Sequence, residues 1–195
     1  MSTSTREIEL KARVTDMDAL RKTLESAGAT LAFEGELHDR IYDTAKRELT
    51  AGDHVLRLRS YVEAGGSRSA HLDWKGPTSR ERGFKVREEL TSGVSEATAL
   101  ADILARLGYS VVGSIDRHIA QYTLQTSGGP VTLRIETYPR MDTLVEVEGS
   151  PDGIEAAIHA TGMARGSFTA NRLADFVRDY EARTGQRAAV CDEDA

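Results

Sequence analysis

The sequence predicts an α+β protein in which antiparallel strands form a closed or nearly closed barrel with helices packed outside it. Three observations support this class. Many segments alternate apolar and polar residues as half-buried strands do, several connections are rich in glycine, and each half of the chain runs strand, helix, then several strands. Closure of the sheet is favoured because it removes unpaired strand edges, which are prone to aggregate. The two halves show no residue-level repeat.

The first half of the chain opens with the clearest strand pattern. Residues 6–14 alternate strictly, with apolar side chains on one face and mostly charged side chains on the other, which predicts a half-buried strand. A helix follows, because Thr15 or Asp16 can cap it, an apolar stripe runs along it, and Gly28 can end it. A polar connection is predicted over residues 44–53. Further strands are predicted over residues 30–43, 55–62, 70–75 and 84–91.

The second half repeats this order of elements. An apolar stripe that includes Leu100 and Leu104 predicts a helix that ends at Gly108. Strands are predicted over residues 109–124, 131–137 and 143–148. Two helices complete the chain, because one apolar stripe begins after Pro151 and another covers residues 169–184.

Length and composition set further limits. The chain has 195 residues, which suits a single domain over residues 1–185 followed by a disordered acidic tail over residues 186–195. No stretch has the roughly 20 apolar residues that a membrane helix requires, and residues 1–6 lack a signal-peptide pattern, so a cytoplasmic protein is expected. The net charge of −6 argues against a general nucleic-acid-binding protein. Cys191 is the single cysteine, which excludes an internal disulfide.

Charged residues recur at every second position on five of the predicted strands. These sets are Glu7, Glu9 and Lys11; Arg57 and Arg59; Lys85, Arg87 and Glu89; Arg134 and Glu136; and Glu146 and Glu148. On any one strand, a solvated outer face explains such a pattern. In a barrel covered by helices, however, the intervening apolar residues point outward. The charged residues would then point into the barrel.

A charged interior restricts the kind of ligand. Unpaired ions lose more hydration on burial than a dry interior returns, so the interior must be wet and filled by a ligand. Clustered basic side chains suit a polyanion, because arginine grips two phosphate oxygens at once. Clustered carboxylates suit Mg²⁺ or Mn²⁺, which bridge carboxylates to phosphates. The two sets together predict a metal-bound triphosphate.

Six motifs in a fixed order carry a resemblance to a known family. They are Glu-Ile-Glu-Leu-Lys at 7–11, His-Asp-Arg-Ile-Tyr-Asp-Thr at 38–44, Leu-Arg-Leu-Arg at 56–59, Trp-Lys-Gly-Pro at 74–77, Lys-Val-Arg-Glu-Glu at 85–89 and Val-Glu-Val-Glu at 145–148. In this order they resemble the CYTH superfamily, the triphosphate tunnel metalloenzymes. The segments at 74–77 and 85–89 are most similar to its class IV adenylyl cyclase branch. The resemblance implies a closed eight-stranded antiparallel β-barrel with a charged tunnel, built from two related halves.

The resemblance also implies roles for individual residues. The ligands of Mg²⁺ or Mn²⁺ would be Glu7, Glu9, Glu136, Glu146 and Glu148. The triphosphate-binding residues would be Lys11, Arg57, Arg59, Lys75, Lys85, Arg87 and Arg117. In the strand that carries Arg117 the family commonly has a Lys-x-Arg pair, whereas this sequence has His118 and Ile119 after the arginine.

For function, the resemblance implies a divalent-metal-dependent enzyme like the class IV adenylyl cyclases, which convert ATP to cAMP and pyrophosphate. An inorganic tripolyphosphatase, or a nucleoside or thiamine triphosphate hydrolase, is an alternative. A third alternative is a non-catalytic module that binds polyphosphate or a triphosphate. The expected partner is a small molecule, ATP or tripolyphosphate, with neither nucleic acid nor a membrane. The oligomeric state stays open, with a homodimer among the alternatives.

Overall fold

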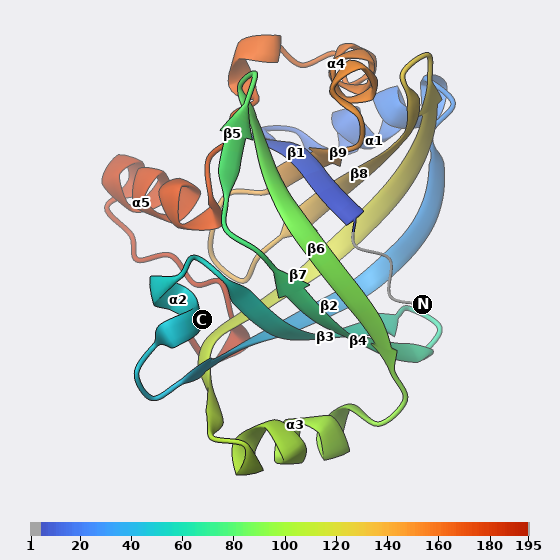
Figure 1. Ribbon diagram of the computed structural model, residues 1–195. Helices are drawn as coiled ribbons and strands as arrows, with labels where there is room; N and C mark the ends of the chain where they lie inside the picture. The colour runs from blue at the N-terminus through green and yellow to red at the C-terminus, as the bar shows by residue number, and fades with distance from the viewer. Residues whose placement is uncertain (1–4, 195) are drawn as a thin grey trace.

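A computed structural model describes residues 5–194 and shows a closed antiparallel β-barrel (Figure 1). The strands are β1 (Thr5–Arg13), β2 (Thr30–Thr44), β3 (Val55–Glu63), β4 (Arg68–Lys75), β5 (Ser79–Glu81), β6 (Phe84–Val94), β7 (Tyr109–Thr126), β8 (Gly129–Thr137) and β9 (Leu144–Glu148). Within the described residues, eight strands follow one another in the order β1-β9-β8-β7-β2-β3-β4-β6, and β6 pairs back with β1. The prediction of a closed eight-stranded antiparallel barrel is confirmed.

The short strand β5 continues the line of β4 instead of widening the barrel. Both strands pair with the side of β6 that faces away from β1. Gly76, Pro77 and Thr78 separate them, and proline has no N–H to offer to the sheet at this point. The interruption matters for the site, because the Gly76 carbonyl is left to accept a hydrogen bond from a side chain inside the barrel.

Five α-helices accompany the barrel in the described part of the chain. They are α1 (Met17–Ser26), α2 (Glu48–Ala51), α3 (Ala97–Arg106), α4 (Pro151–Ala160) and α5 (Leu173–Thr184). Asp16 caps α1 as expected, since its side chain accepts a hydrogen bond from the Ala19 amide at 2.9 Å. The short helix α2 falls in the segment for which the sequence predicts only a polar connection. None of these helices is long and apolar enough to cross a membrane.

The last helix begins later than the sequence predicts. The predicted start is residue 169, whereas residues 169–172 are not helical and α5 begins at Leu173. The cause is a backbone pairing with β1. The Lys11 amide donates to the Thr169 carbonyl at 2.9 Å, and the Thr169 amide donates back to the Lys11 carbonyl at 2.8 Å. This pairing covers the edge of β1 beyond its contact with β6 and brings the start of α5 to one end of the barrel.

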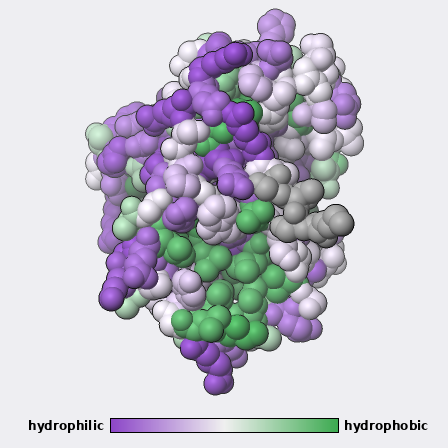
Figure 2. All heavy atoms as spheres, in the orientation of Figure 1, coloured by the Kyte–Doolittle hydropathy of each residue, from purple (hydrophilic) through white to green (hydrophobic). Residues whose placement is uncertain are grey.

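The hydrophobic core lies between the outside of the barrel and the helices. Its larger cluster joins Leu24 of α1 and Ile154 of α4 to strand residues such as Leu10, Leu133 and Val147, each at most 1% exposed. A smaller cluster joins Leu104 of α3 to Tyr42 of β2 and Leu58 of β3. Figure 2 shows apolar side chains reaching the surface in that lower part of the molecule. Because the strand residues of the larger cluster point outward, their alternate neighbours point into the barrel.

Residues 186–194, for which the sequence predicts disorder, lie against the barrel. The Asp116 amide donates to the Val190 carbonyl at 2.8 Å. The side chains of Ala189 and Cys191 are buried. The segment covers the part of the β7 edge that extends beyond its pairing with β8.

Removal of residues 186–195 is expected to lower the melting temperature by about 5 °C or more. It uncovers buried apolar surface and removes the Val190 carbonyl that accepts a hydrogen bond from the Asp116 amide. Thermal unfolding followed by circular dichroism measures the change. A chain that ends after Asp192 keeps both contacts and is the control. Equal melting temperatures for the long truncation and the full chain would show that the tail adds nothing to stability.

Candidate functional site

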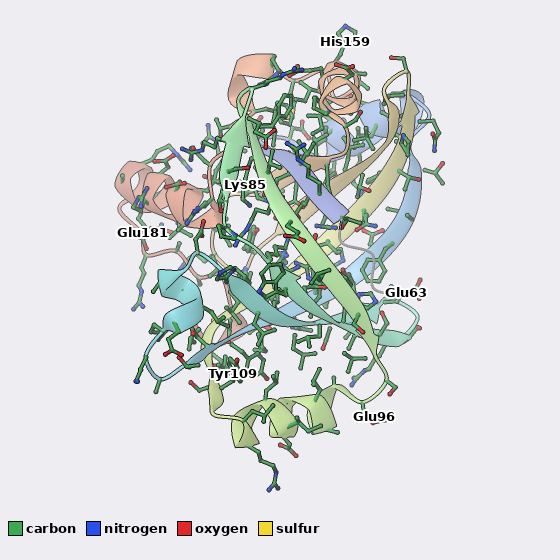
Figure 3. All side chains as sticks on the ribbon, in the orientation of Figure 1. Glu63, Lys85, Glu96, Tyr109, His159 and Glu181 are labelled. Carbon is green, nitrogen blue, oxygen red and sulfur yellow. The ribbon has the colours of Figure 1, made fainter. Side chains whose placement is uncertain are left out.

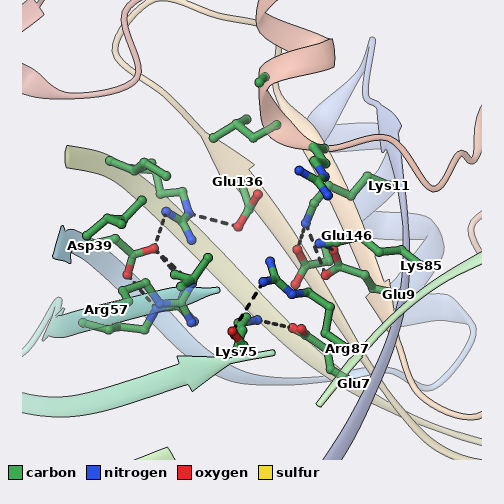
Figure 4. Close-up of a pocket in the computed structure, with 18 of the residues that line it drawn as sticks. Glu7, Glu9, Lys11, Asp39, Arg57, Lys75, Lys85, Arg87, Glu136 and Glu146 are labelled. Carbon is green, nitrogen blue, oxygen red and sulfur yellow. Dashed lines mark hydrogen bonds and ion pairs between the residues drawn. The ribbon is translucent and has the colours of Figure 1, made fainter. Parts of the chain in front are cut away.

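The barrel contains a cavity of about 380 Å³ whose lining is mostly ionic. Nine basic and six acidic side chains contribute to it. Figure 4 labels ten of the charged residues that line it, including Glu9, Asp39 and Arg87, and marks hydrogen bonds and ion pairs between the residues drawn. In the wider view of Figure 3, side chains fill the space between the strands, whereas His159 of α4 projects away from the barrel. The excess of cations suits a polyanionic ligand.

The cavity brings together all but one of the residues selected from the sequence. They are Glu7, Glu9, Lys11, Arg57, Arg59, Lys75, Lys85, Arg87, Arg117, Glu136 and Glu146. The exception is Glu148, which is half-buried and lies opposite Glu9 in the ladder between β1 and β9.

Strand register explains why the charges share one space. In the ladder between β1 and β9, Leu10 pairs with Val147, and both side chains are buried in the outer core. Successive side chains of a strand point to opposite sides of the sheet. Their charged neighbours, Glu9 and Glu148 among them, are therefore directed to the inside of the barrel.

Glu9 of β1 and Glu146 of β9 are paired with cations in the described structure. Glu9 forms ion pairs with Lys11 and Lys85, and Glu146 forms ion pairs with Lys11 and Arg134. Burial alone would raise the pKa of Glu9, but the ammonium groups, Lys11 first, lower it below its ordinary value. The Glu9 carboxylate is therefore ionised at neutral pH.

Glu7 has one carboxylate oxygen that no described protein group satisfies. Its Oε1 accepts a hydrogen bond from the Lys75 ammonium at 2.5 Å, whereas its Oε2 is buried without a hydrogen-bond partner in the described part of the chain. Burial and then the Glu7 charge raise the pKa of Glu148. A buried, unpaired carboxylate oxygen is costly, and a cation beside it would remove that cost. Since the donors here are carboxylate oxygens, the site fits a hard divalent cation such as Mg²⁺ or Mn²⁺.

Arg117 connects the carboxylates to a second group of charges. Its Nε donates to Glu136 at 2.9 Å and its Nη1 donates to Asp39 at 3.1 Å. Burial alone would raise the pKa of Glu136, but Arg117 and then Lys11 lower it to about 2. The Tyr138 hydroxyl donates to the other Glu136 oxygen at 2.7 Å. Glu136 is therefore ionised and held in one orientation.

Arg87 differs from the other basic residues on the strands that line the cavity. Its guanidinium donates to the backbone carbonyls of Gly76 and Asp53, each at 2.6 Å, and makes no salt bridge within the described residues. Burial lowers its pKa. A buried guanidinium without a carboxylate partner has its charge available for an anion that enters the cavity.

The start of α5 supplies part of the lining at one end of the cavity. Arg172, Leu173 and Ala174 all contribute to it. Arg172 donates to Asp53 Oδ2 at 3.0 Å and to Thr78 Oγ1 at 3.1 Å. These bonds attach the helix start to the connections on either side of β3 and β4.

Five charged or phenolic residues of the lining are assigned no metal or phosphate role from the sequence. They are Asp39, Asp53, Arg134, Tyr138 and Arg172. Two carried a usable signal, because Asp39 lies within the motif at 38–44 and Arg134 shares a strand face with Glu136. Arg172 carried none, since only the path of the chain from Thr169 brings it to the cavity.

A separate group of potential metal ligands lies outside the cavity. His38, Asp116 and Asp192 place ligand-type atoms within 4.8 Å of one another. Arg40 already donates to Asp116 at 2.6 Å, and the Asp192 amide donates to the other Asp116 oxygen at 3.2 Å. This group therefore serves to hold the C-terminal segment against β7.

Comparisons place this fold among known proteins. A family model described as CYTH domain matches residues 5–138. A protein of Vibrio parahaemolyticus assigned as an adenylate cyclase has a solved structure with a TM-score of 0.72 at 18% identity, over 90% of this chain and 99% of that one. PH1012 of Pyrococcus horikoshii OT3 gives a TM-score of 0.67 at 18% identity, over 87% and 98%.

A third solved structure has a similar fold. HpAC1 of Hippeastrum, assigned as an adenylyl cyclase and described with a dominant triphosphatase activity, gives a TM-score of 0.61 at 18% identity, over 92% of this chain and 96% of that one. No curated protein matches the sequence. At these identities the likeness to solved structures concerns the fold.

Proposed function

Since the chain belongs to the CYTH family, whose domain model covers residues 5–138, we propose that it is a divalent-metal-dependent enzyme that acts on a triphosphate substrate. The observation that carries this proposal is the cavity, where buried cations and buried carboxylates surround one space. A polyanion alone would be repelled by the carboxylates, and a metal ion alone would be repelled by the cations. A triphosphate with a bound divalent cation suits both sets.

We assign the metal to five carboxylates. They are Glu7, Glu9, Glu136, Glu146 and Glu148. The unpartnered Oε2 of Glu7 and the raised pKa of Glu148 support this assignment, because both are relieved by a nearby positive charge. Bound Mg²⁺ or Mn²⁺ would supply neutralisation of phosphate charge and orientation of the phosphate oxygens.

We assign the triphosphate to the basic residues. They are Lys11, Arg57, Arg59, Lys75, Lys85, Arg87 and Arg117. Each arginine can bind two phosphate oxygens at once, and each lysine acts as a point charge. Alignment of the phosphates and stabilisation of developing charge are most of what phosphoryl transfer requires of a protein. No nucleophilic side chain is needed.

The first reaction that we propose is cyclisation of ATP, as in class IV adenylyl cyclases. The ribose 3′-oxygen bonds to the α-phosphorus, the bond from that phosphorus to the bridging oxygen breaks, and pyrophosphate leaves. The hydroxyl proton passes to solvent. The basic residues stabilise the pyrophosphate as its charge develops.

Hydrolysis of a triphosphate is the second candidate, and two observations favour it. The similar protein HpAC1 is described with a dominant triphosphatase activity. In addition, Ile119 is fully buried on β7 where the family commonly has a second basic residue. In this reaction water attacks the terminal phosphorus and orthophosphate is released. A non-catalytic binding module is less well supported, because all five carboxylates are present.

The test incubates the protein with Mg²⁺ or Mn²⁺ and, in turn, ATP, GTP, thiamine triphosphate and tripolyphosphate, with products identified by mass. We expect a product to form with Mg²⁺ or Mn²⁺ and not to form when EDTA replaces the metal. Cyclic AMP with pyrophosphate selects the cyclase, and orthophosphate selects the hydrolase. Binding of tripolyphosphate without any product would select the module and contradict the enzyme proposal.

A further inference from the structure

Asp39 is a fully buried carboxylate at the centre of the arginine cluster (Figure 4). Arg59 donates to it through Nε at 2.7 Å and through Nη2 at 2.9 Å. Arg117 donates through Nη1 at 3.1 Å, and Arg57 donates through Nη1 at 3.4 Å. One carboxylate therefore accepts four hydrogen bonds from three arginines.

The order of the strands allows Asp39 to reach all three guanidinium groups. β2 lies between β3 and β7 in the barrel. In the two ladders, Asp39 is paired with Arg59 on β3 and with Ile115 on β7. Arg57 and Arg117 lie two residues beyond these partners, on the same inward faces. The contacts are thus a consequence of barrel register.

The Asp39 carboxylate carries its charge in this setting. Burial alone would raise its pKa, but Arg57 and Arg59 hold the pKa well below its usual value. The arginines keep donors that take no part in these bonds, such as Nη1 of Arg59 and Nη2 of Arg117. All three arginines line the cavity, so these donors are placed at its wall.

We propose that Asp39 is a positioning residue that orients Arg57, Arg59 and Arg117 for the triphosphate. This inference rests on the proposed function. Three guanidinium groups in one cavity repel one another, and a shared anion holds them together. Since the side chains are ordered before the ligand arrives, less conformational entropy is lost on binding. Asp39 itself need not touch the ligand.

The charge of Asp39 and its geometry predict opposite effects on binding. The substitution Asp39→Asn adds one unit of positive charge to the cavity wall. If charge alone matters, a triphosphate binds the variant more tightly. If Asp39 positions the arginines, the triphosphate binds the variant more weakly in spite of the added charge.

The experiment measures the binding of tripolyphosphate with Mg²⁺ to the wild type, Asp39→Asn and Asp73→Asn by titration calorimetry. Asp73 is the matched control. It is also buried and its loss removes the same charge, but among the three arginines it bonds only Arg57. We expect the Kd to rise about tenfold or more for Asp39→Asn and less than about threefold for Asp73→Asn. KM for the substrate should rise more than kcat falls.

Equal or tighter binding by Asp39→Asn overturns the inference and leaves the proposed function intact. If the wild type neither binds nor consumes a triphosphate, both proposals are wrong. Should Asp39→Asn fail to fold, Asp39→Asn with Arg59→Gln restores the wild-type net charge. That double variant should bind tripolyphosphate more weakly than Arg59→Gln alone, although it carries one more positive charge. Tighter binding by the double variant contradicts the positioning role.

Discussion

Replacement of Glu7 and Glu9 together by glutamine is expected to lower metal-dependent turnover by about a thousandfold or more. Both carboxylates are buried at the cavity, and Glu7 carries the unpartnered Oε2. Glutamine has nearly the same shape, but its amide is neutral and binds a hard cation far less well. The measurement is kcat/KM as a function of Mg²⁺ and Mn²⁺ concentration, together with direct binding of Mn²⁺.

The chain offers a matched control for this double variant. Glu34 and Glu36 have the same spacing on β2, but Glu36 is exposed and Glu34 pairs with Arg21 of α1. Glutamine at both positions removes the same charge outside the cavity and should leave kcat/KM within about twofold. If the Glu7 and Glu9 variant folds and keeps its turnover, these two residues are not metal ligands.

Replacement of Arg87 by glutamine is expected to lower kcat/KM by about a hundredfold, mainly through a higher KM. Arg87 is bound to the backbone carbonyls of Gly76 and Asp53 and forms no salt bridge in the described structure, so no carboxylate has to be displaced before it binds phosphate. Its guanidinium should therefore contribute more to triphosphate affinity than an arginine that already has an anionic partner.

Arg80 provides the control for the Arg87 variant. It lies on β5 in the same hairpin and is exposed, so Arg80→Gln removes the same charge without altering the cavity. Steady-state kinetics of both variants, with melting temperatures to confirm folding, separate a loss of affinity from a loss of structure. An unchanged KM in a folded Arg87→Gln variant would remove Arg87 from the triphosphate site.

Most of the strands could be predicted from the sequence, because alternation of apolar and polar residues is a local property of the backbone. The elements that were not predicted are short. β5 has three residues and α2 has four, too few to show a period. The start of α5 was predicted too early because the pairing of Thr169 with Lys11 joins segments that are far apart in the chain.

The candidate site was also predictable where it depends on local pattern, and not where it depends on contacts between distant strands. Charges at every second position could be assigned to one face of each strand, and closure of the sheet then directed that face inward. Asp39 was missed because the sequence around it shows no charged residue at the same spacing, and its partners come from other strands.

The sequence by itself therefore determined which side chains share a face of a strand, and that the apolar faces need a covering of helices. Only the tertiary structure decided which charges meet. Strand register and closure bring Glu7 to Lys75 across 68 residues and Asp39 to Arg117 across 78. The physical reason is the separation of the interacting groups along the sequence. The direction of a side chain depends on its own backbone, whereas an ion pair depends on how strands far apart in the chain align.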